Sequence, residues 1–297
     1  MTKLKILVTG GGKFAFNWML LTNSKFDNIF ISKTNRGLFG DNKFITLNLT
    51  EYSNLSRIIR EVKPHVIINT AAITNVDYCE THPSQCREVN TDVAVTLSQI
   101  ANEQKIKFIQ LSTDHFESKI SDSRCENVHP IPVNEYGSAK INADIILQAV
   151  ESNMVVRTNF FGFSPIEMEN SFRELLNILR NDEIYLGYKD IFYTPISTPI
   201  LVESISHLIS IDFTGLINIV GNSNLSKFDF AKKVAQITGK GDQKILRIAY
   251  KSTQSSTKRP KNMGLLNTKL IEIFPNFSGD LEENIKKAIE SFSGRVP

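Results

Sequence analysis

The stretch KILVTGGGKFAF, residues 5–16, decides the fold of this chain. Its apolar first part predicts a buried strand over residues 5–9, and the three glycines that follow predict a tight turn. Residues 14–21 then favour a helix. A strand, a glycine turn and a helix in this order form a βα unit, in which the N–H groups at the start of the helix can hold a pyrophosphate.

The same alternation of strand and helix continues outward from this unit. Strands are expected over residues 28–32, 43–47, 65–69, 108–111 and 154–157, and helices over 55–62, 89–104 and 136–150. A loop is expected from the strand that ends at residue 69 through Pro83. Strands and helices in strict alternation predict an α/β fold with a doubly wound parallel sheet, a Rossmann fold. We therefore expect a dinucleotide-binding domain over residues 1–157, with later returns near 192–220.

The pattern becomes less regular beyond residue 158, and a smaller substrate-binding region is expected over residues 158–191 and 221–297. Helices are expected over residues 172–180, 201–209, 226–238 and 281–292, with a strand over 216–220. Ser226 is suited to cap the third of these helices and Gly239 to end it.

Composition narrows the classes of function. The chain has 297 residues, 41% of them hydrophobic, and a net charge of +3, which predicts a globular protein with no nucleic acid partner. Residues 6–8 are too short an apolar run for a secretory signal, and no run is long enough to cross a membrane. Three cysteines, Cys79, Cys86 and Cys125, show no metal-site spacing, so reduced thiols, a cytoplasmic location and no metal are expected.

The cofactor is suggested by two features. Gly10, Gly12 and Ala15 have the G-x-G-x-x-A spacing of a dinucleotide turn. After the second strand, residues 32–36 contain no acid that would bind the ribose of NAD, whereas Lys33 and Arg36 can pair with the 2′-phosphate of NADP. An ordinary solvated basic loop is the alternative.

Tyr136 and Lys140 are four residues apart, so they share one face of the predicted helix. A tyrosine has a reference pKa of ~10, and a neighbouring cation favours its ionised form, which makes it a better proton donor. Thr113 follows a predicted parallel strand at the edge where such sheets build their sites. For the isolated motifs, the alternatives are a surface pair of side chains four residues apart and a threonine that bonds its own strand-end turn. The order of the motifs after the glycine turn nevertheless indicates a site.

These motifs resemble those of extended short-chain dehydrogenases/reductases, and within them of the dTDP-4-dehydrorhamnose reductase group. Residues 68–80, INTAAITNVDYCE, resemble that group's N-A-A-A-x-T-x-V-D-x-x-E segment. Further similarities, in the expected order, lie at residues 89–90, 112–114, 156–158, 215–221 and 259–260. The resemblance spans nearly the whole chain.

The resemblance implies a Thr-Tyr-Lys site. Tyr136 would donate a proton to a sugar ketone, Thr113 would bond the same oxygen, and Lys140 would hold the nicotinamide ribose. The candidate cofactor-binding residues are Gly10, Gly12, Lys13, Phe14, Ala15, Lys33, Arg36, Asn48, Leu49, Ala71, Ala72, Thr74, Asn90, Ser112 and Lys140. The candidate substrate-binding residues are Thr74, Val76, Asp114, His115, Phe160 and Arg259. For Phe160 the alternative is a place in the core, as it is for Phe161 and Phe163, and for Arg259 it is a solvated basic loop.

The resulting hypothesis is a reductase of a 4-keto sugar nucleotide that uses NADP(H) in preference to NAD(H) and acts in surface-polysaccharide biosynthesis. A homodimer is the candidate assembly, and the sequence leaves the oligomeric state open. The chain departs from the family pattern at Lys13 and Phe16, which replace two glycines, and at His115, which replaces a tyrosine. Phe16 is expected to push its helix from the sheet or to redirect the helix start. An epimerase or dehydratase on the same fold and a catalytically silent regulatory subunit are the alternatives.

Overall fold

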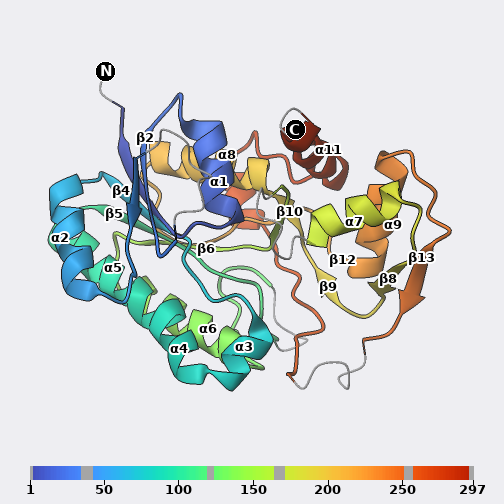
Figure 1. Ribbon diagram of the computed structural model, residues 1–297, viewed down its shortest axis with the longest axis horizontal. Coiled ribbons are helices and arrows are strands. Elements are labelled where there is room, and N and C mark those ends of the chain that lie inside the picture. Colours follow the sequence, from blue (N-terminus) through green and yellow to red (C-terminus); the bar gives the residue numbers. More distant parts are fainter. Residues whose placement is uncertain (1–2, 35–42, 119–123, 164–170, 251–256, 294–297) are drawn as a thin grey trace. The chain divides into compact units, whose positions relative to one another are not determined.

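The computed structural model describes residues 3–34, 43–118, 124–163, 171–250 and 257–293. Its main feature is a seven-stranded sheet with the order β11-β6-β5-β4-β1-β2-β3 (Figure 1). Strands β1 to β6 pair in parallel, so the expected α/β fold with a doubly wound sheet is confirmed. The strands span Lys5–Thr9 (β1), Asp27–Ser32 (β2), Lys43–Thr46 (β3), Val66–Asn69 (β4), Lys107–Leu111 (β5), Met154–Arg157 (β6) and Gly215–Asn218 (β11).

Helices cover both faces of this sheet. Helices α2, α5 and α6 pack on one face, and α1 lies on the other (Figure 1). Side chains from the first face form a core with strand residues such as Leu7, Ile67 and Phe108, all of which are fully buried. The helices of this part are Lys13–Thr22 (α1), Tyr52–Val62 (α2), Val76–Thr81 (α3), Pro83–Arg87 (α4), Val93–Glu103 (α5) and Glu135–Gln148 (α6).

The segment between β4 and α5 differs from the sequence-based expectation. The expected loop contains α3, which Asn75 caps by accepting a hydrogen bond from the Tyr78 N–H, and α4, which begins at Pro83. The expected helix over residues 89–104 opens with a π-helical turn, Glu88–Asp92, before α5 begins. These short helices are stabilised by a capping side chain and by a proline at the first helical position. They show no apolar periodicity that the sequence analysis could have used.

Short strands and longer helices make up the rest of the chain. Strands β7 and β10 pair in parallel, as do β8 and β13, whereas β9 and β12 pair antiparallel. A core around Phe161, Phe172 and Phe230 holds these elements together through contacts between the rings. The elements are Phe160–Phe161 (β7), Ser171–Arg180 (α7), Tyr185–Tyr188 (β8), Phe192–Tyr193 (β9), Ile196–Ser197 (β10), Thr198–Ser210 (α8), Leu225–Ser226 (β12), Lys227–Ile237 (α9), Ile245–Ile248 (β13), Thr268–Ile273 (α10) and Leu281–Ser293 (α11).

The chain divides into two compact units. The first holds Met1–Thr113, Asn134–Val156 and Ser210–Leu216, and the second holds the remainder. These bounds differ from the expected ones in two places. Residues 114–133 belong to the second unit and not to the first. Of the residues near 192–220 that were expected to rejoin the first unit, only residues 210–216 do so. Residues 114–133 join the second unit because two hydrogen bonds attach them to it. The Leu266 N–H donates to the Arg124 carbonyl oxygen at 2.8 Å, and the Asn218 N–H donates to Glu126 Oε1 at 2.8 Å.

Within the described ranges, no helix combines the length and the apolar character that crossing a membrane requires.

Candidate active site

The glycine turn after β1 requires a glycine at its first position. Gly10 has a φ of +90°, which L side chains rarely adopt, and its N–H donates to the Ile31 carbonyl oxygen at 2.8 Å. A Cβ atom at Gly10 would lie 2.8 Å from Thr70 Oγ1 and 2.9 Å from the Ala71 nitrogen. The turn is therefore held tightly between β2 and the end of β4.

Gly12 serves a different purpose. It caps α1 with φ −87° and ψ −169°, angles that any residue adopts, and a Cβ atom there would meet nothing within 4 Å. Among the residues that the structure describes, no side chain caps α1, and its first turn carries no acid. An uncapped helix N-terminus beside open space fits the pyrophosphate of a dinucleotide.

The two departures from the family's glycine pattern are accommodated. Helix α1 begins at Lys13, and Phe16 is buried at 9% exposure, so its side chain packs within the protein. Burial lowers the pKa of Lys13 to about 8. Phe14 is buried and stacks on Trp18 with ring centroids 5.8 Å apart, so its ring is part of the packing of α1. Ala15 is fully buried.

The residues expected to choose between NADP and NAD lie after β2. Lys33 is exposed there, as a phosphate ligand requires. Arg36 lies outside the described residues. The choice of 2′-phosphate ligands stays a prediction.

Two predicted cofactor contacts after β3 have local roles in the structure. Leu49 is buried in the core of the first unit. Asn48 is half-buried, and its Oδ1 atom accepts a hydrogen bond from the Thr50 N–H at 3.5 Å. Neither side chain is held toward the glycine turn by a hydrogen bond that the structure defines.

The loop after β4 is fixed by Asn90, which lies in the π-helical turn. The Asn90 amide accepts from the Ile73 N–H at 2.8 Å and donates to the Ile73 carbonyl oxygen at 3.0 Å. Because both ends of the buried amide are bonded to Ile73, Asn90 fixes the position of this loop; its predicted contact with the cofactor stays a prediction. Within this loop Ala71 and Ala72 are half-buried and Thr74 is exposed, whereas Val76 is buried at the start of α3.

Helix α6 carries the tyrosine and the lysine. Asn134 caps it by accepting from the Gly137 N–H at 2.8 Å, which places Tyr136 in the first turn. The Lys140 ammonium is buried, donates to the Leu111 carbonyl oxygen at 2.8 Å and so ties α6 to the end of β5. Burial lowers the pKa of Lys140 to about 8.

Two hydroxyl groups follow directly after Leu111. Thr113 is buried at 7% exposure and Ser112 at 8%. The Ser112 N–H donates to the Val156 carbonyl oxygen, while its hydroxyl has no hydrogen-bond partner among the residues that the structure describes. An unpartnered buried hydroxyl beside Thr113 fits a site that a ligand completes.

Tyr136 rests on a small cluster of buried side chains. Cys79, Cys86 and Ala139 form this cluster, with Ile73 packed against it. Burial raises the pKa of both the Cys79 and the Cys86 thiol, and neither cysteine is in a disulfide, so both serve here as buried packing groups. The cluster supports the tyrosine from the side of α3 and α4.

The second unit contains the predicted substrate residues Asp114 and His115. Asp114 is buried, and its Oδ2 atom accepts a hydrogen bond from Asn159 Nδ2 at 2.8 Å. Burial raises the pKa of Asp114 to about 7, against the opposing effects of Asn159 and the Lys227 charge. Burial and the cations Arg259 and Lys227 lower the pKa of His115 to about 4, so its imidazole is neutral near pH 7.

Sequence reasoning missed Lys227 and Asn159, because nothing in their local pattern marks them. Both lie far from Asp114 in the sequence, and only the tertiary structure brings them to it. Arg259 is half-buried and acts on both His115 and Lys227. The role of Arg259 in binding the substrate stays a prediction. Phe160 is half-buried, whereas Phe161 and Phe163 are buried, as the core alternative expects.

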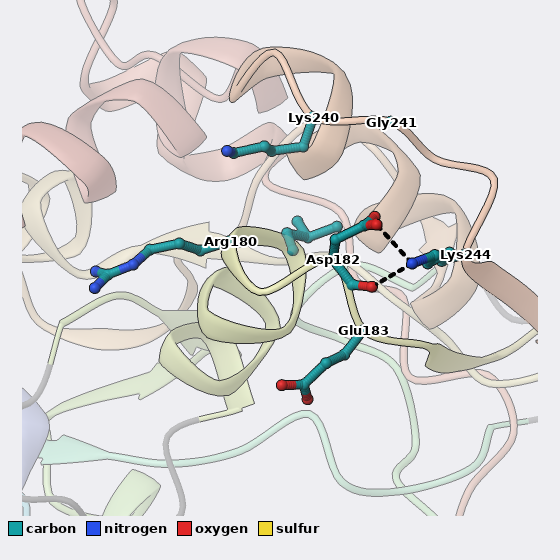
Figure 2. Close-up of a pocket in the computed structure, with 7 residues that line it drawn as sticks. Arg180, Asp182, Glu183, Lys240, Gly241 and Lys244 are labelled. Atoms are coloured by element: carbon teal, nitrogen blue, oxygen red, sulfur yellow. Dashed lines mark hydrogen bonds and ion pairs between the residues drawn. The ribbon is translucent and has the colours of Figure 1, made fainter.

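A surface pocket elsewhere in the second unit contains none of the predicted site residues. It has a volume of about 220 Å³, and the Lys244 ammonium donates across it to the side chain and main chain of Asp182 (Figure 2). It is lined by Leu179, Arg180, Asp182, Glu183, Lys240, Gly241 and Lys244. Its mixed charges are balanced in part by the ion pair between Lys244 and Asp182.

The sheet, the glycine turn and the α6 pair together define an extended short-chain dehydrogenase/reductase. The model of the RmlD substrate binding domain family matches residues 4–293, and the chain belongs to this family. The predicted family is thus confirmed.

Individual relatives agree with this assignment. The chain is 23% identical to the dTDP-4-dehydrorhamnose reductase of Escherichia coli over 254 residues, 80% of this chain and 84% of that protein. It is also 23% identical to the probable low-salt glycan biosynthesis reductase Agl14 of Haloferax volcanii over 205 residues, 67% of this chain and 68% of that protein. A crystal structure of the Bacillus anthracis dTDP-4-dehydrorhamnose reductase in complex with NADP is 21% identical, covers 98% of this chain and 100% of that one, and superposes with a TM-score of 0.86.

Proposed function

We propose that this protein is an NADPH-dependent reductase that converts the 4-keto group of a deoxysugar nucleotide into a hydroxyl group. The observation that carries the proposal is the buried Lys140 ammonium, bonded to the end of β5 one helical turn from Tyr136. The names of the relatives from Escherichia coli and Bacillus anthracis support the substrate class, and the NADP complex of the latter supports the cofactor.

The chemistry needs a proton for the oxygen that becomes an alkoxide. NADPH, when bound at the glycine turn, supplies the hydride. Tyr136 donates the proton from its hydroxyl, and the Thr113 hydroxyl orients the same oxygen. The Lys140 charge favours release of that proton, and in this proposal its ammonium holds the nicotinamide ribose.

Two observations weigh against the alternative functions, a catalytically silent regulatory subunit and a dehydratase. The regulatory-subunit alternative relied on the altered glycine turn, but the open space beside Gly12 and the uncapped start of α1 leave room for a pyrophosphate. The dehydratase alternative needs an acid pair after the strand-end threonine, and Asp114 is followed by His115. Both points favour the reductase.

Four further parts of the hypothesis rest on the relatives and the sequence. The name of the Haloferax volcanii relative supports a role in glycan biosynthesis. A cytoplasmic location and a homodimer remain predictions, as does the assignment of the cofactor to the first unit and of the substrate to the second.

The test is a titration with NADPH and with NADH, followed by an assay with 4-keto sugar nucleotides. The proposal expects tighter binding of NADPH and loss of nicotinamide absorbance when a 4-keto sugar nucleotide is added. A protein that binds neither dinucleotide is not a reductase.

A further inference from the structure

A chain of buried hydrogen bonds crosses the carboxyl ends of three neighbouring strands. Thr9 of β1 and Asn69 of β4 are register partners, as are Asn69 and Gln110 of β5, so the three side chains stand on one face of the sheet. Thr9 Oγ1 donates to Asn69 Oδ1 at 2.5 Å, and Asn69 Nδ2 donates to Gln110 Oε1 at 2.7 Å. Gln110 Nε2 donates at 2.7 Å to the Leu111 carbonyl oxygen, which also accepts the bond from Lys140.

A main-chain donor fixes the direction of this chain of bonds. The Ala71 N–H donates to Asn69 Oδ1 at 3.2 Å, so the oxygen end of this amide faces Ala71 and Thr9. The nitrogen end is therefore directed to Gln110, whose oxygen accepts and whose nitrogen is left to donate to Leu111. The orientation of the Gln110 amide thus follows from one backbone N–H just beyond β4.

The stability of the sheet does not explain these polar side chains. Thr9 and Asn69 are fully buried, and Gln110 is 1% exposed. Buried amides cost free energy unless their hydrogen bonds are made, a cost that apolar side chains at the same positions would avoid. The main-chain pairing of β1, β4 and β5 joins the strands without them. What these side chains add is a fixed donor on the Leu111 carbonyl group.

The Leu111 carbonyl group decides where the Lys140 ammonium lies. Among the residues that the structure describes, its oxygen is the one hydrogen-bond acceptor of Lys140 Nζ. Two ionisable groups act on Lys140, Asp144 on the same helix and Cys86 on α4, and both favour its charged form. Gln110 Nε2 and Lys140 Nζ both lie within 2.8 Å of the same oxygen, so the amide and the ammonium are close neighbours. A shift of Gln110 would therefore move the acceptor on which the buried charge depends.

We propose that Gln110 is a positioning residue of the reductase, which holds the Lys140 ammonium in place through the Leu111 carbonyl group. Asn69 holds Gln110 in turn. The inference rests on the proposed function, because it takes Lys140 to act on Tyr136 and on the nicotinamide ribose. Gln110 acts only through Lys140 and is assigned no contact with a ligand.

The first experiment compares Gln110→Met with Asn153→Leu in the full-length protein. Asn153 is a similarly buried amide of the same unit, and its Nδ2 atom donates to Ser98 Oγ at 2.8 Å and to the Leu147 carbonyl oxygen at 2.9 Å. Both variants lose the bonds of a buried amide, so both should lose a similar amount of stability in denaturant unfolding. With NADPH and a 4-keto sugar nucleotide, only Gln110→Met should lower kcat, by about tenfold or more, because it displaces a group at the reacting centre. The KM of the sugar nucleotide should stay close to the wild-type value in both variants.

The second experiment needs no turnover and uses a variant that keeps the acceptor for Asn69. Gln110→Glu places a carboxylate beside the Lys140 ammonium, whereas Asn153→Asp places one away from it. Lysine labelled with carbon-13 at Cε reports the protonation of Lys140 by NMR, and its resonance is identified by its absence in Lys140→Arg. Gln110→Glu should move the titration of Lys140 to higher pH by about one pH unit or more, and Asn153→Asp should leave it unchanged. A role limited to the stability of the sheet does not move this titration.

The inference is overturned if Gln110→Met and Asn153→Leu lower kcat alike, or if Lys140 titrates in Gln110→Glu as it does in the wild type. Should Gln110→Met fail to fold, the titration of Gln110→Glu decides.

Failure of the proposed function gives a different result. A wild-type protein that reduces no 4-keto sugar nucleotide, together with a shifted Lys140 titration in Gln110→Glu, would overturn the reductase and leave the link between Gln110 and Lys140 standing. An active wild type with an unshifted titration in Gln110→Glu would overturn only the inference.

Discussion

The Lys140 ammonium donates a 2.8 Å hydrogen bond to the Leu111 carbonyl oxygen. This bond joins the helix that carries Tyr136 to the strand end that precedes Thr113. Three residues of the predicted catalytic set are thus tied together by one buried charge. The charge is also the part of the site most sensitive to pH, since burial lowers the pKa of Lys140 to about 8.

Reductase activity should therefore fall as the pH rises through about 8. Below this value Lys140 is protonated and supports Tyr136, and above it the ammonium loses its charge. The measurement is kcat as a function of pH for the wild type and for Lys140→Arg, whose guanidinium stays charged. The alkaline limb should move to higher pH in the variant. An identical alkaline limb in the two proteins would assign the titration to another group.

Gly10 and Gly12 should respond differently to alanine. Gly10→Ala should lower the free energy of unfolding by about 1–3 kcal/mol, because the positive φ and the contacts with Thr70 and Ala71 strain the new side chain. Gly12→Ala should cost less than about 1 kcal/mol, the usual size of a changed helix cap. Its Cβ atom would nevertheless occupy the open space, so NADPH affinity should fall about tenfold or more. Denaturant unfolding measures the loss of stability, and NADPH titration measures the loss of cofactor affinity. Full NADPH affinity in Gly12→Ala would exclude a pyrophosphate at this position.

Asn90→Ala should weaken both stability and cofactor binding. The variant loses two hydrogen bonds to Ile73 and leaves buried main-chain groups unsatisfied, a loss of about 2–4 kcal/mol. Denaturant unfolding measures the cost, and NADPH titration measures the loosening of the loop after β4. The control is Asn54→Ala, which removes only an exposed bond to Glu51. Equal stability of the two variants would show that Asn90 does not hold the loop.

The stability difference between Asp114→Asn and the wild type should depend on pH. The folded-state pKa of Asp114 is about 7, above its ordinary value of 3.8, so the folded protein holds this proton more firmly than the unfolded chain does. The stabilisation is complete below about pH 4 and is lost as the pH rises through about 7. As the pH rises from about 4 to about 7, the Tm of Asp114→Asn should therefore fall less than the Tm of the wild type. Parallel Tm curves would place the pKa of Asp114 near its ordinary value.

The parallel sheet could be predicted because its strands are continuous apolar runs. Residues 5–9 and 65–69 show this pattern, which is typical of strands buried on both faces. Helix α3 was missed because Asn75 and tertiary contacts stabilise six residues without apolar periodicity. The two-residue strands β7, β9 and β10 are too short for any period to be visible.

The candidate site could be predicted where a motif lies within one segment. Tyr136 and Lys140 share a helix turn, and their spacing is visible in the sequence. Lys227 could not be found in this way, because its neighbours Asp114 and Arg259 come from distant segments. The structural roles of Leu49 and Asn90 were equally hidden, since core packing and a main-chain clamp leave no local signature.

The most direct test of the reductase is the loss of NADPH absorbance in the presence of dTDP-4-keto-6-deoxysugar, compared between the wild type and Tyr136→Phe. The wild type should consume NADPH only when the ketone is present. Tyr136→Phe should bind NADPH with wild-type affinity but lose about 10²- to 10⁴-fold in kcat, because it lacks the proton donor. A wild-type protein that binds NADPH and reduces neither this ketone nor other 4-keto sugar nucleotides, or a Tyr136→Phe variant with full activity, would contradict the account.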